Sequence, residues 1–244
     1  MEMILLDWTR MGQYYCLAGA VVENNHIRIV RPLLAKKGQQ PQRNLGWSPF
    51  YIEGHTRWEI FELCGEHEAN LELPHSEDLW VRGLKPLQKL ATPEQRRAIL
   101  LATTFPPSEP LFGVPLQSTR ISAFLLPGAG DRSLATVVVP GERIAFQGSW
   151  RSGMAEPDIR VTLPVPELGT LTTVVKDHHF LLKAEPGNPA LAKRLQVLKQ
   201  TIDRMGDRIA VRLGLSRGYQ ANPTGPAFCY LMADGFFSLA DPQP

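Results

Sequence analysis

The sequence has few cysteines and no long apolar run, and its charges nearly balance. No stretch of about 18 apolar residues occurs, so no membrane-spanning helix is predicted. The N-terminus lacks a basic flank and a cleavage site, so residues 3–6 predict a first strand and not a signal peptide. The cysteines Cys16, Cys64 and Cys229 are far apart and form no CxxC pair. This usage is typical of a reduced cytoplasm and indicates no zinc site.

Motifs of the common catalytic folds are also missing. The chain has no Walker A sequence, no GxSxG, and no GxGxxG after a strand. Gly128 and Gly130 precede an expected strand and not a helix, so they are not expected to hold a dinucleotide. The sequence therefore predicts no cofactor, and it leaves open whether the protein is an enzyme.

The net charge of +2 excludes a polycation that binds nucleic acid by bulk attraction alone. The 26 basic residues are 18 arginines and 8 lysines. Arginine presents a planar fork suited to phosphates and base edges, so this excess favours nucleic-acid contact. A GC-rich genome would produce the same excess, together with the many proline, alanine and glycine residues.

Short strands separated by turn residues dominate the first half of the chain. Pro32 is expected to end the third strand, and residues 36–46 form a polar loop. Thr92 is followed by proline and then by Gln95, which predicts a capping box and a helix through Ala102. The expected strands are Met3–Leu6, Tyr14–Val22, Ile27–Val30, Phe50–Ile52 and Trp58–Leu63.

The second half repeats the pattern of strands followed by one helix. Asn188 and Pro189 predict the start of this helix, and apolar residues at helical spacing continue it to Gly206. The expected strands are Ala135–Val139, Arg143–Trp150, Ile159–Val165, Leu171–Leu182, Arg208–Leu215 and Ala227–Ala233. Two helices are too few for a parallel α/β sheet. The sequence therefore predicts a mainly β fold of two small OB-like barrels, residues 1–112 and 113–244. One large sandwich with helical insertions is the alternative.

The first candidate cluster surrounds the second and third strands. Arg10 and Tyr14 flank a glycine turn, and residues 16–20 include small side chains that permit close approach of a ligand. Arg31 stands before Pro32 at an expected strand end, near a barrel rim. Rims and open faces of OB folds bind oligonucleotides. A solvent-exposed edge with a glycine bulge is the alternative interpretation.

The second cluster is a histidine beside two carboxylates. His75, Glu77 and Asp78 follow a proline, and could form an acid–base site with Asp177, or a simple rigid turn. Their spacing matches no standard zinc site. Asp177 precedes His178 and His179 in an expected strand. Adjacent side chains of a strand point to opposite faces, so the two histidines would not bind one metal ion together. No metal is predicted.

The third cluster lies near the C-terminus. Arg212 is expected on the strand face opposite the apolar residues, and Ser216, Arg217 and Tyr219 follow at the strand end. An arginine with a tyrosine at such a transition can hold a phosphate and stack a base. An ordinary turn with a solvated arginine is the alternative.

Taken in order, these motifs resemble those of the bacterial dual OB-domain family. The resemblance implies two OB folds and nucleic-acid binding or modification, with Arg31, His75, Glu77, Asp78, Arg212 and Arg217 as candidates. The chain departs from the family at residues 7–10, where a more polar turn is expected, and at Gly218, where a proline is expected. The matching segments are Cys16, Ala18-Gly19, Arg31-Pro32, residues 74–78, residues 212–217 and Cys229–Leu231.

Three hypotheses follow. The first is a nucleic-acid-binding protein, with DNA or RNA left open, in which arginines contact phosphates and tyrosines stack on bases. The second is an enzyme acting on nucleic acid or nucleotides through His75, Glu77 and Asp78. The third is a protein-interaction subunit of a defence or processing complex. The candidate nucleic-acid contacts are Arg10, Tyr14, Arg31, Arg212, Ser216, Arg217 and Tyr219.

Overall fold

The structure of the chain is a computed structural model. It describes residues 1–24, 26–34, 46–65, 67–68, 73–106, 108–119, 122–150, 156–165, 167–184, 190–220 and 224–240. The predicted polar loop, apart from Gly46, and the predicted helix start at Asn188 and Pro189 lie outside these residues. None of the helices in the described ranges has the length and apolar character needed to span a bilayer.

The first sheet contains seven strands in the order β5-β6-β3-β2-β1-β4-β7. Strand β1, between β2 and β4, is buried on both faces, because alternate residues enter two different cores. Met3 and Leu5 pack inside the first sheet, whereas Ile4 and Leu6 face the other half of the molecule. The strands are β1 (Glu2–Met11), β2 (Tyr14–Glu23), β3 (His26–Leu34), β4 (Glu59–Cys64), β5 (His67–Glu68), β6 (Asp78–Val81) and β7 (Gly83–Leu90).

The second sheet has the main order β10-β14-β15-β13-β12-β11, and β9 joins β15 at its N-terminal end with β8 beside it. Strand β12 alternates buried and half-buried residues, as expected for a sheet with one face on a core. The strands are β8 (Gln117–Ser118), β9 (Ala123–Leu125), β10 (Leu134–Pro140), β11 (Ala145–Ser149), β12 (Asp158–Val165), β13 (Gly169–Val175), β14 (Arg208–Leu215) and β15 (Cys229–Ser238).

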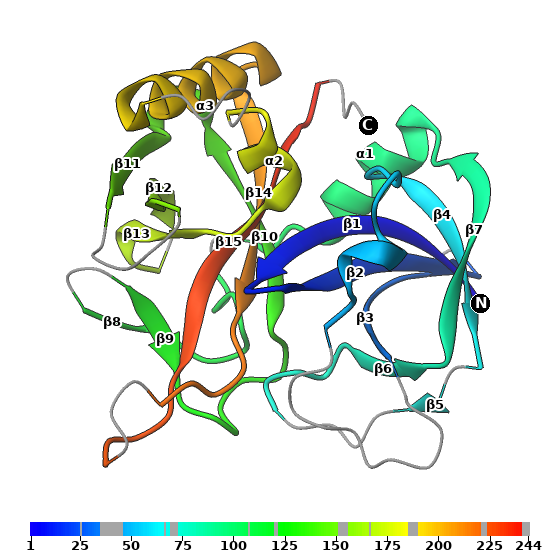
Figure 1. The fold of residues 1–244 in the computed structure, drawn as a ribbon. Coiled ribbons are helices and arrows are strands. Elements are labelled where there is room, and N and C mark those ends of the chain that lie inside the picture. Colours follow the sequence, from blue (N-terminus) through cyan, green and yellow to red (C-terminus); the bar gives the residue numbers. More distant parts are fainter. Residues whose placement is uncertain are drawn as a thin grey trace.

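Both sheets curl, and they lie side by side with β1, β10, β14 and β15 in the middle of the molecule (Figure 1). The prediction of a mainly β protein with two barrel-like sheets is therefore confirmed. The described helices are few: α1 (Pro93–Ala102), α2 (His178–Leu182), α3 (Leu191–Met205) and two short 3₁₀ turns, η1 (Pro49–Tyr51) and η2 (Gly141–Arg143). The predicted capping box of α1 is present, with Thr92 and Gln95 bonded to each other's backbone N–H.

Three local predictions were wrong. Phe50–Ile52 is not a strand, because Pro49 begins the 3₁₀ turn η1 there. Pro32 does not end β3, which changes partner at Arg31 and continues to Leu34 beside β6. The strand predicted over Leu171–Leu182 ends at Val175, because the Asp177 carboxylate accepts a hydrogen bond from Phe180 N and so begins α2.

In addition to the core of each sheet, a further apolar cluster lies between the two sheets. We call β1–β7 with α1 the N-terminal half, and β8–β15 with α2 and α3 the C-terminal half. Ile4, Leu6 and Trp58 of the N-terminal half pack in one cluster with Ala210 and Phe237 of the C-terminal half. The halves are thus joined by a buried hydrophobic interface, and the predicted boundary at residue 112 stays a prediction.

Candidate nucleic-acid interface

A buried polar network surrounds Arg31 where the two halves meet. Strand β3 runs parallel to β6, and this register places Arg31 beside Asp78. The Arg31 Nη1 atom lies 2.8 Å from His75 Nδ1 and 3.4 Å from Asp78 Oδ1, and its Nη2 donates to Ser133 Oγ at 2.5 Å. Arg31 is 4% exposed. Its guanidinium therefore binds side chains of both halves and is not open to a phosphate, contrary to the predicted role.

Glu77 connects this network to the start of β10. Its Oε1 accepts hydrogen bonds from the backbone N–H groups of Ser133, at 2.8 Å, and Leu134, at 3.0 Å. Its Oε2 accepts from Ser133 Oγ at 2.8 Å. A carboxylate that receives three hydrogen bonds is well satisfied in a buried place. The segment 74–78 therefore attaches the N-terminal half to the C-terminal half.

His75 is neutral in this network. Arg31 stays protonated and can only donate, so Nδ1 of His75 accepts and the ring proton is on Nε2. Burial, together with the positive charges of Arg31 and Arg217, lowers the pKa of His75 to about 2. The Ser216 backbone raises this pKa, although Nε2 makes no hydrogen bond of normal geometry to any described residue. A histidine of this pKa does not exchange protons at neutral pH.

Asp177, the predicted partner of His75, is held elsewhere. Its Oδ1 forms an ion pair with Arg57, and its Oδ2 accepts a hydrogen bond from Phe236 N at 3.2 Å. The Arg57 guanidinium also lies over the Phe237 ring, 4.7 Å from its centroid. Asp177 and His75 therefore serve two separate junctions between the halves. In the described part of the chain, no three His, Cys, Asp or Glu side chains are grouped to hold a metal ion.

Arg212 lies in the interface and not on a polar sheet face. Strand β14 is buried on both sides beyond its first residue, so the predicted division into polar and apolar faces was wrong. Arg212 is 1% exposed. It donates from Nε and Nη2 to the Asp7 carboxylate and from Nη1 to Thr136 Oγ1 at 3.2 Å. As with Arg31, its hydrogen-bonding capacity is used inside the chain.

A second buried carboxylate, Asp234, lies near this pair. It is the extra residue of a β-bulge in β15, between the residues that pair with Arg212 and Leu213. Burial, together with the negative charge of the nearby Asp7, raises the pKa of Asp234 to about 8. Sequence reasoning missed Asp7, Asp234, Ser133 and Arg57. A signal existed for the first two, since Asp7 stands between Leu6 and Trp8 in β1 and Asp234 is the one charged residue of β15.

Four aromatic rings form a half-exposed cluster at the outer end of β15. We call this cluster, Phe124, Tyr219, Phe228 and Tyr230, the aromatic patch. The Phe124 and Phe228 rings lie 4.5 Å apart, and the Tyr230 ring lies 6.2 Å from Phe124 and 6.5 Å from Tyr219. Tyr219 is 60% exposed and is fixed by reciprocal backbone hydrogen bonds with Phe228. The patch therefore presents ring surface from a rigid backbone.

Ser216 and Arg217 adjoin the aromatic patch. Ser216 bonds the Tyr230 backbone twice: its N–H donates to Tyr230 O at 2.8 Å, and its Oγ accepts from Tyr230 N at 2.9 Å. Arg217 donates from Nη2 to Asp78 Oδ2 at 2.6 Å. The Arg217 side chain is 30% exposed, whereas that of Asp78 is 4% exposed. Arg217 thus reaches from the edge of the patch to the N-terminal half.

Arg10 and Tyr14 lie at the tip of the β1–β2 hairpin. Tyr14 is 41% exposed. The Arg10 side chain is 42% exposed and pairs with Glu156 of the C-terminal half at 2.6 Å. Of the predicted nucleic-acid contacts, Arg10, Tyr14, Ser216, Arg217 and Tyr219 are therefore at least partly exposed.

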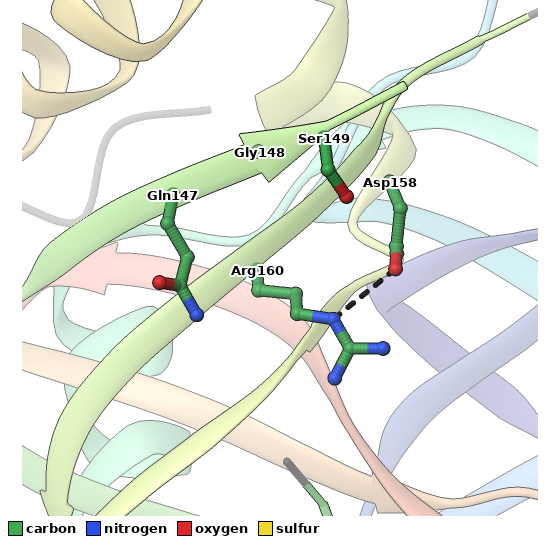
Figure 2. Close-up of a pocket in the computed structure, with 5 residues that line it drawn as sticks. All are labelled: Gln147, Gly148, Ser149, Asp158 and Arg160. Atoms are coloured by element: carbon green, nitrogen blue, oxygen red, sulfur yellow. Dashed lines mark hydrogen bonds and ion pairs between the residues drawn. The ribbon is translucent and has the colours of Figure 1, made fainter. Parts of the chain in front are cut away.

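A cavity of about 240 Å³ lies elsewhere, on β11 and β12 (Figure 2). It is lined by Gln147, Gly148, Ser149, Asp158 and Arg160. Arg160 Nε donates to Asp158 Oδ2 at 3.1 Å, so the basic side chain of this cavity is paired. The cavity contains none of the predicted site residues.

No protein-family model matches the chain. No curated protein matches it either. Among solved structures, a murine DNA-binding protein bound to double-stranded DNA is similar over 96% of this chain and 98% of its own, at 10% sequence identity. The TM-score is 0.30. A similarity at this level carries no argument about fold or ligand.

Proposed function

We propose that this protein binds nucleic acid through the aromatic patch and Arg217. The observation that carries the proposal is the position of Arg217 and Tyr219, two residues apart, beside three further half-exposed rings. Both residues were predicted as nucleic-acid contacts from the sequence alone. Rings on an open sheet combined with a basic side chain are the features by which OB-like folds bind single strands.

The aromatic patch fits bases because each base offers a flat face to a ring. Stacking of this kind requires unpaired bases, and it is tolerant of sequence. Tyr219 is the most exposed ring of the patch. The other three rings pack against one another and so hold each other in place: Phe124, Phe228 and Tyr230. We therefore expect single strands to bind in preference to duplexes.

Arg217 fits a phosphate because only part of its guanidinium is occupied. Among the described residues, its hydrogen-bond partner is Asp78, bonded through Nη2. The remaining N–H groups can donate to a phosphate oxygen, and the pairing with Asp78 fixes where they point.

Fluorescence anisotropy with short single- and double-stranded DNA and RNA, at low and moderate salt, tests the proposal. Tyr219→Ala should weaken binding roughly 5- to 150-fold, the range for loss of one stacked base. Arg217→Ala should weaken binding and reduce the slope of log affinity against log salt by about one. Trp150→Ala and Arg204→Ala, at exposed residues outside the patch, are the matched controls.

Failure of every oligonucleotide to bind at low salt would refute the proposal. Equal effects of Tyr219→Ala and Trp150→Ala would refute the role of the patch while leaving nucleic-acid binding intact. The catalytic hypothesis has less support, because His75 is buried and neutral and Asp177 is bonded to Arg57.

A further inference from the structure

The partly exposed residues of the N-terminal half continue along one face of β2. Successive side chains of a strand alternate, so Tyr14, Cys16 and Ala18 share a face. Ala18 pairs in register with Asp7, whose carboxylate binds Arg212 of the C-terminal half. This face is therefore buried against the C-terminal half at Ala18, half-buried at Cys16 and exposed at Tyr14.

Cys16 lies two residues from Tyr14 on this face of β2. Burial raises the pKa of the Cys16 thiol, and the positive charges of Arg31 and Arg217 act in the opposite direction. The negative charges of Asp234 and Asp78 also raise the pKa of this thiol. Independently of charge, Val30 of β3 pairs with Gly19 of β2, and the next residue, Arg31, is bonded to Asp78, which holds Arg217. This chain of contacts connects Arg217 to the middle of β2. Since a strand rises about 3.3 Å per residue, Tyr14 is about 7 Å from Cys16 along the same face.

The tip of the β1–β2 hairpin rests on the C-terminal half at this place. Arg10 N donates to Lys176 O at 3.2 Å, and Thr9 forms an isolated β-bridge with Asp177. The ion pair between Arg10 and Glu156 spans the same junction at the surface. Tyr14 is thereby held at the line where the two halves meet, and its ring is exposed there.

We infer that a bound nucleic-acid strand crosses from the aromatic patch over Arg217 onto Tyr14, so that both halves hold one ligand. This inference rests on the proposed function. Arg217 stands at the crossing point, because it belongs to the C-terminal half and is bonded to Asp78 of the N-terminal half. Tyr14 supplies a second stacking ring beyond it, on the other side of the junction between the halves.

Photo-crosslinking tests this inference without altering the protein. A thymidine oligonucleotide of roughly 12 nucleotides, within the site size of OB folds, would carry 5-iodouracil at successive positions. Mass spectrometry of the irradiated complex should find adducts on Tyr14 as well as on Tyr219 or Tyr230. Adducts confined to the C-terminal half would overturn the inference and leave the proposed function standing.

Affinity measurements on variants give a second test. Tyr14→Ala should weaken binding of this oligonucleotide roughly 5-fold or more, as for loss of one stacked base, and Tyr14→Phe should bind normally. Phe50→Ala removes an exposed ring of the same half and serves as the control. Unchanged affinity of Tyr14→Ala would refute the crossing. Absence of binding to the unaltered protein would instead refute the proposed function.

Discussion

Arg212 and Asp7 form a fully buried ion pair between the two sheets, although 205 positions separate them in the chain. Arg212 Nη2 lies 2.7 Å and Nε 3.0 Å from Asp7 Oδ2. Each residue is 1% exposed. Two such charges tolerate burial only because each satisfies the other. The pair therefore ties the position of β1 to that of β14.

Loss of one member of this pair should strongly destabilise the protein. Arg212→Ala leaves the Asp7 carboxylate buried without its partner, so the free energy of unfolding should fall by roughly 3–5 kcal/mol. Urea unfolding followed by circular dichroism measures this change. The exposed Arg204→Ala should change it by less than about 0.5 kcal/mol.

A double-mutant cycle separates the pair from its two members. Asp7→Ala with Arg212→Ala together should cost less than the sum of the two single changes, because no charge is then left unpaired. Additive costs would show that the two side chains act independently.

Asp234 should make the protein less stable as the pH rises towards 8. Its pKa is raised from 3.8 to about 8, so between these values the folded protein holds a proton that the unfolded chain has released. Stability then falls with increasing pH, by at most about 1.4 kcal/mol per unit. Asp234→Asn mimics the protonated acid and should flatten this dependence. Urea unfolding at several values between pH 6.5 and 8 tests it, and an identical slope in the variant would contradict the assignment.

His75 should make the protein less stable as the pH falls below 6.5, the opposite of the pH dependence expected for Asp234. Its pKa is lowered from 6.5 to about 2, so below pH 6.5 the unfolded chain gains a proton that the folded protein does not bind. Stability is therefore lost as the pH falls from 6.5 towards 2. His75→Gln keeps an acceptor for Arg31 and should reduce the acid sensitivity of unfolding between pH 6 and 4. The exposed His26→Gln is the control, and equal curves for both variants would contradict the prediction.

Local patterns in the sequence were enough to predict most strands and the start of α1. Ile159 to Val165 alternate as a half-buried strand does, and Thr92 with Gln95 forms the expected capping box. The beginning of α2 was missed because apolar residues resume at Phe180, after the polar residues 176–179. There the hydrogen bond of the Asp177 side chain to Phe180 N prevails over the strand pattern.

The candidate site was predictable only in part, because burial depends on distant partners. Tyr219 is exposed and Arg217 is partly exposed, and both follow the end of β14. Arg31 and Arg212 have similar strand contexts, yet both are covered by the opposite half. Their burial arises from partners far away in the chain: Ser133, 102 positions from Arg31, and Asp7, 205 positions from Arg212. No short sequence spacing encodes such contacts.

The two halves should fold as one cooperative unit. If residues 1–112 and 113–244 are produced separately, Ile4, Leu6 and Trp58 lose their packing against Phe237, and the partners of the buried ion pairs are lost as well. Neither fragment should then show a cooperative thermal transition by circular dichroism, whereas the full chain should show one. Mixing the fragments during refolding should restore it, because the missing surfaces are complementary. Two independent transitions in the full chain, each matching one fragment, would mean that the shared core contributes little to stability.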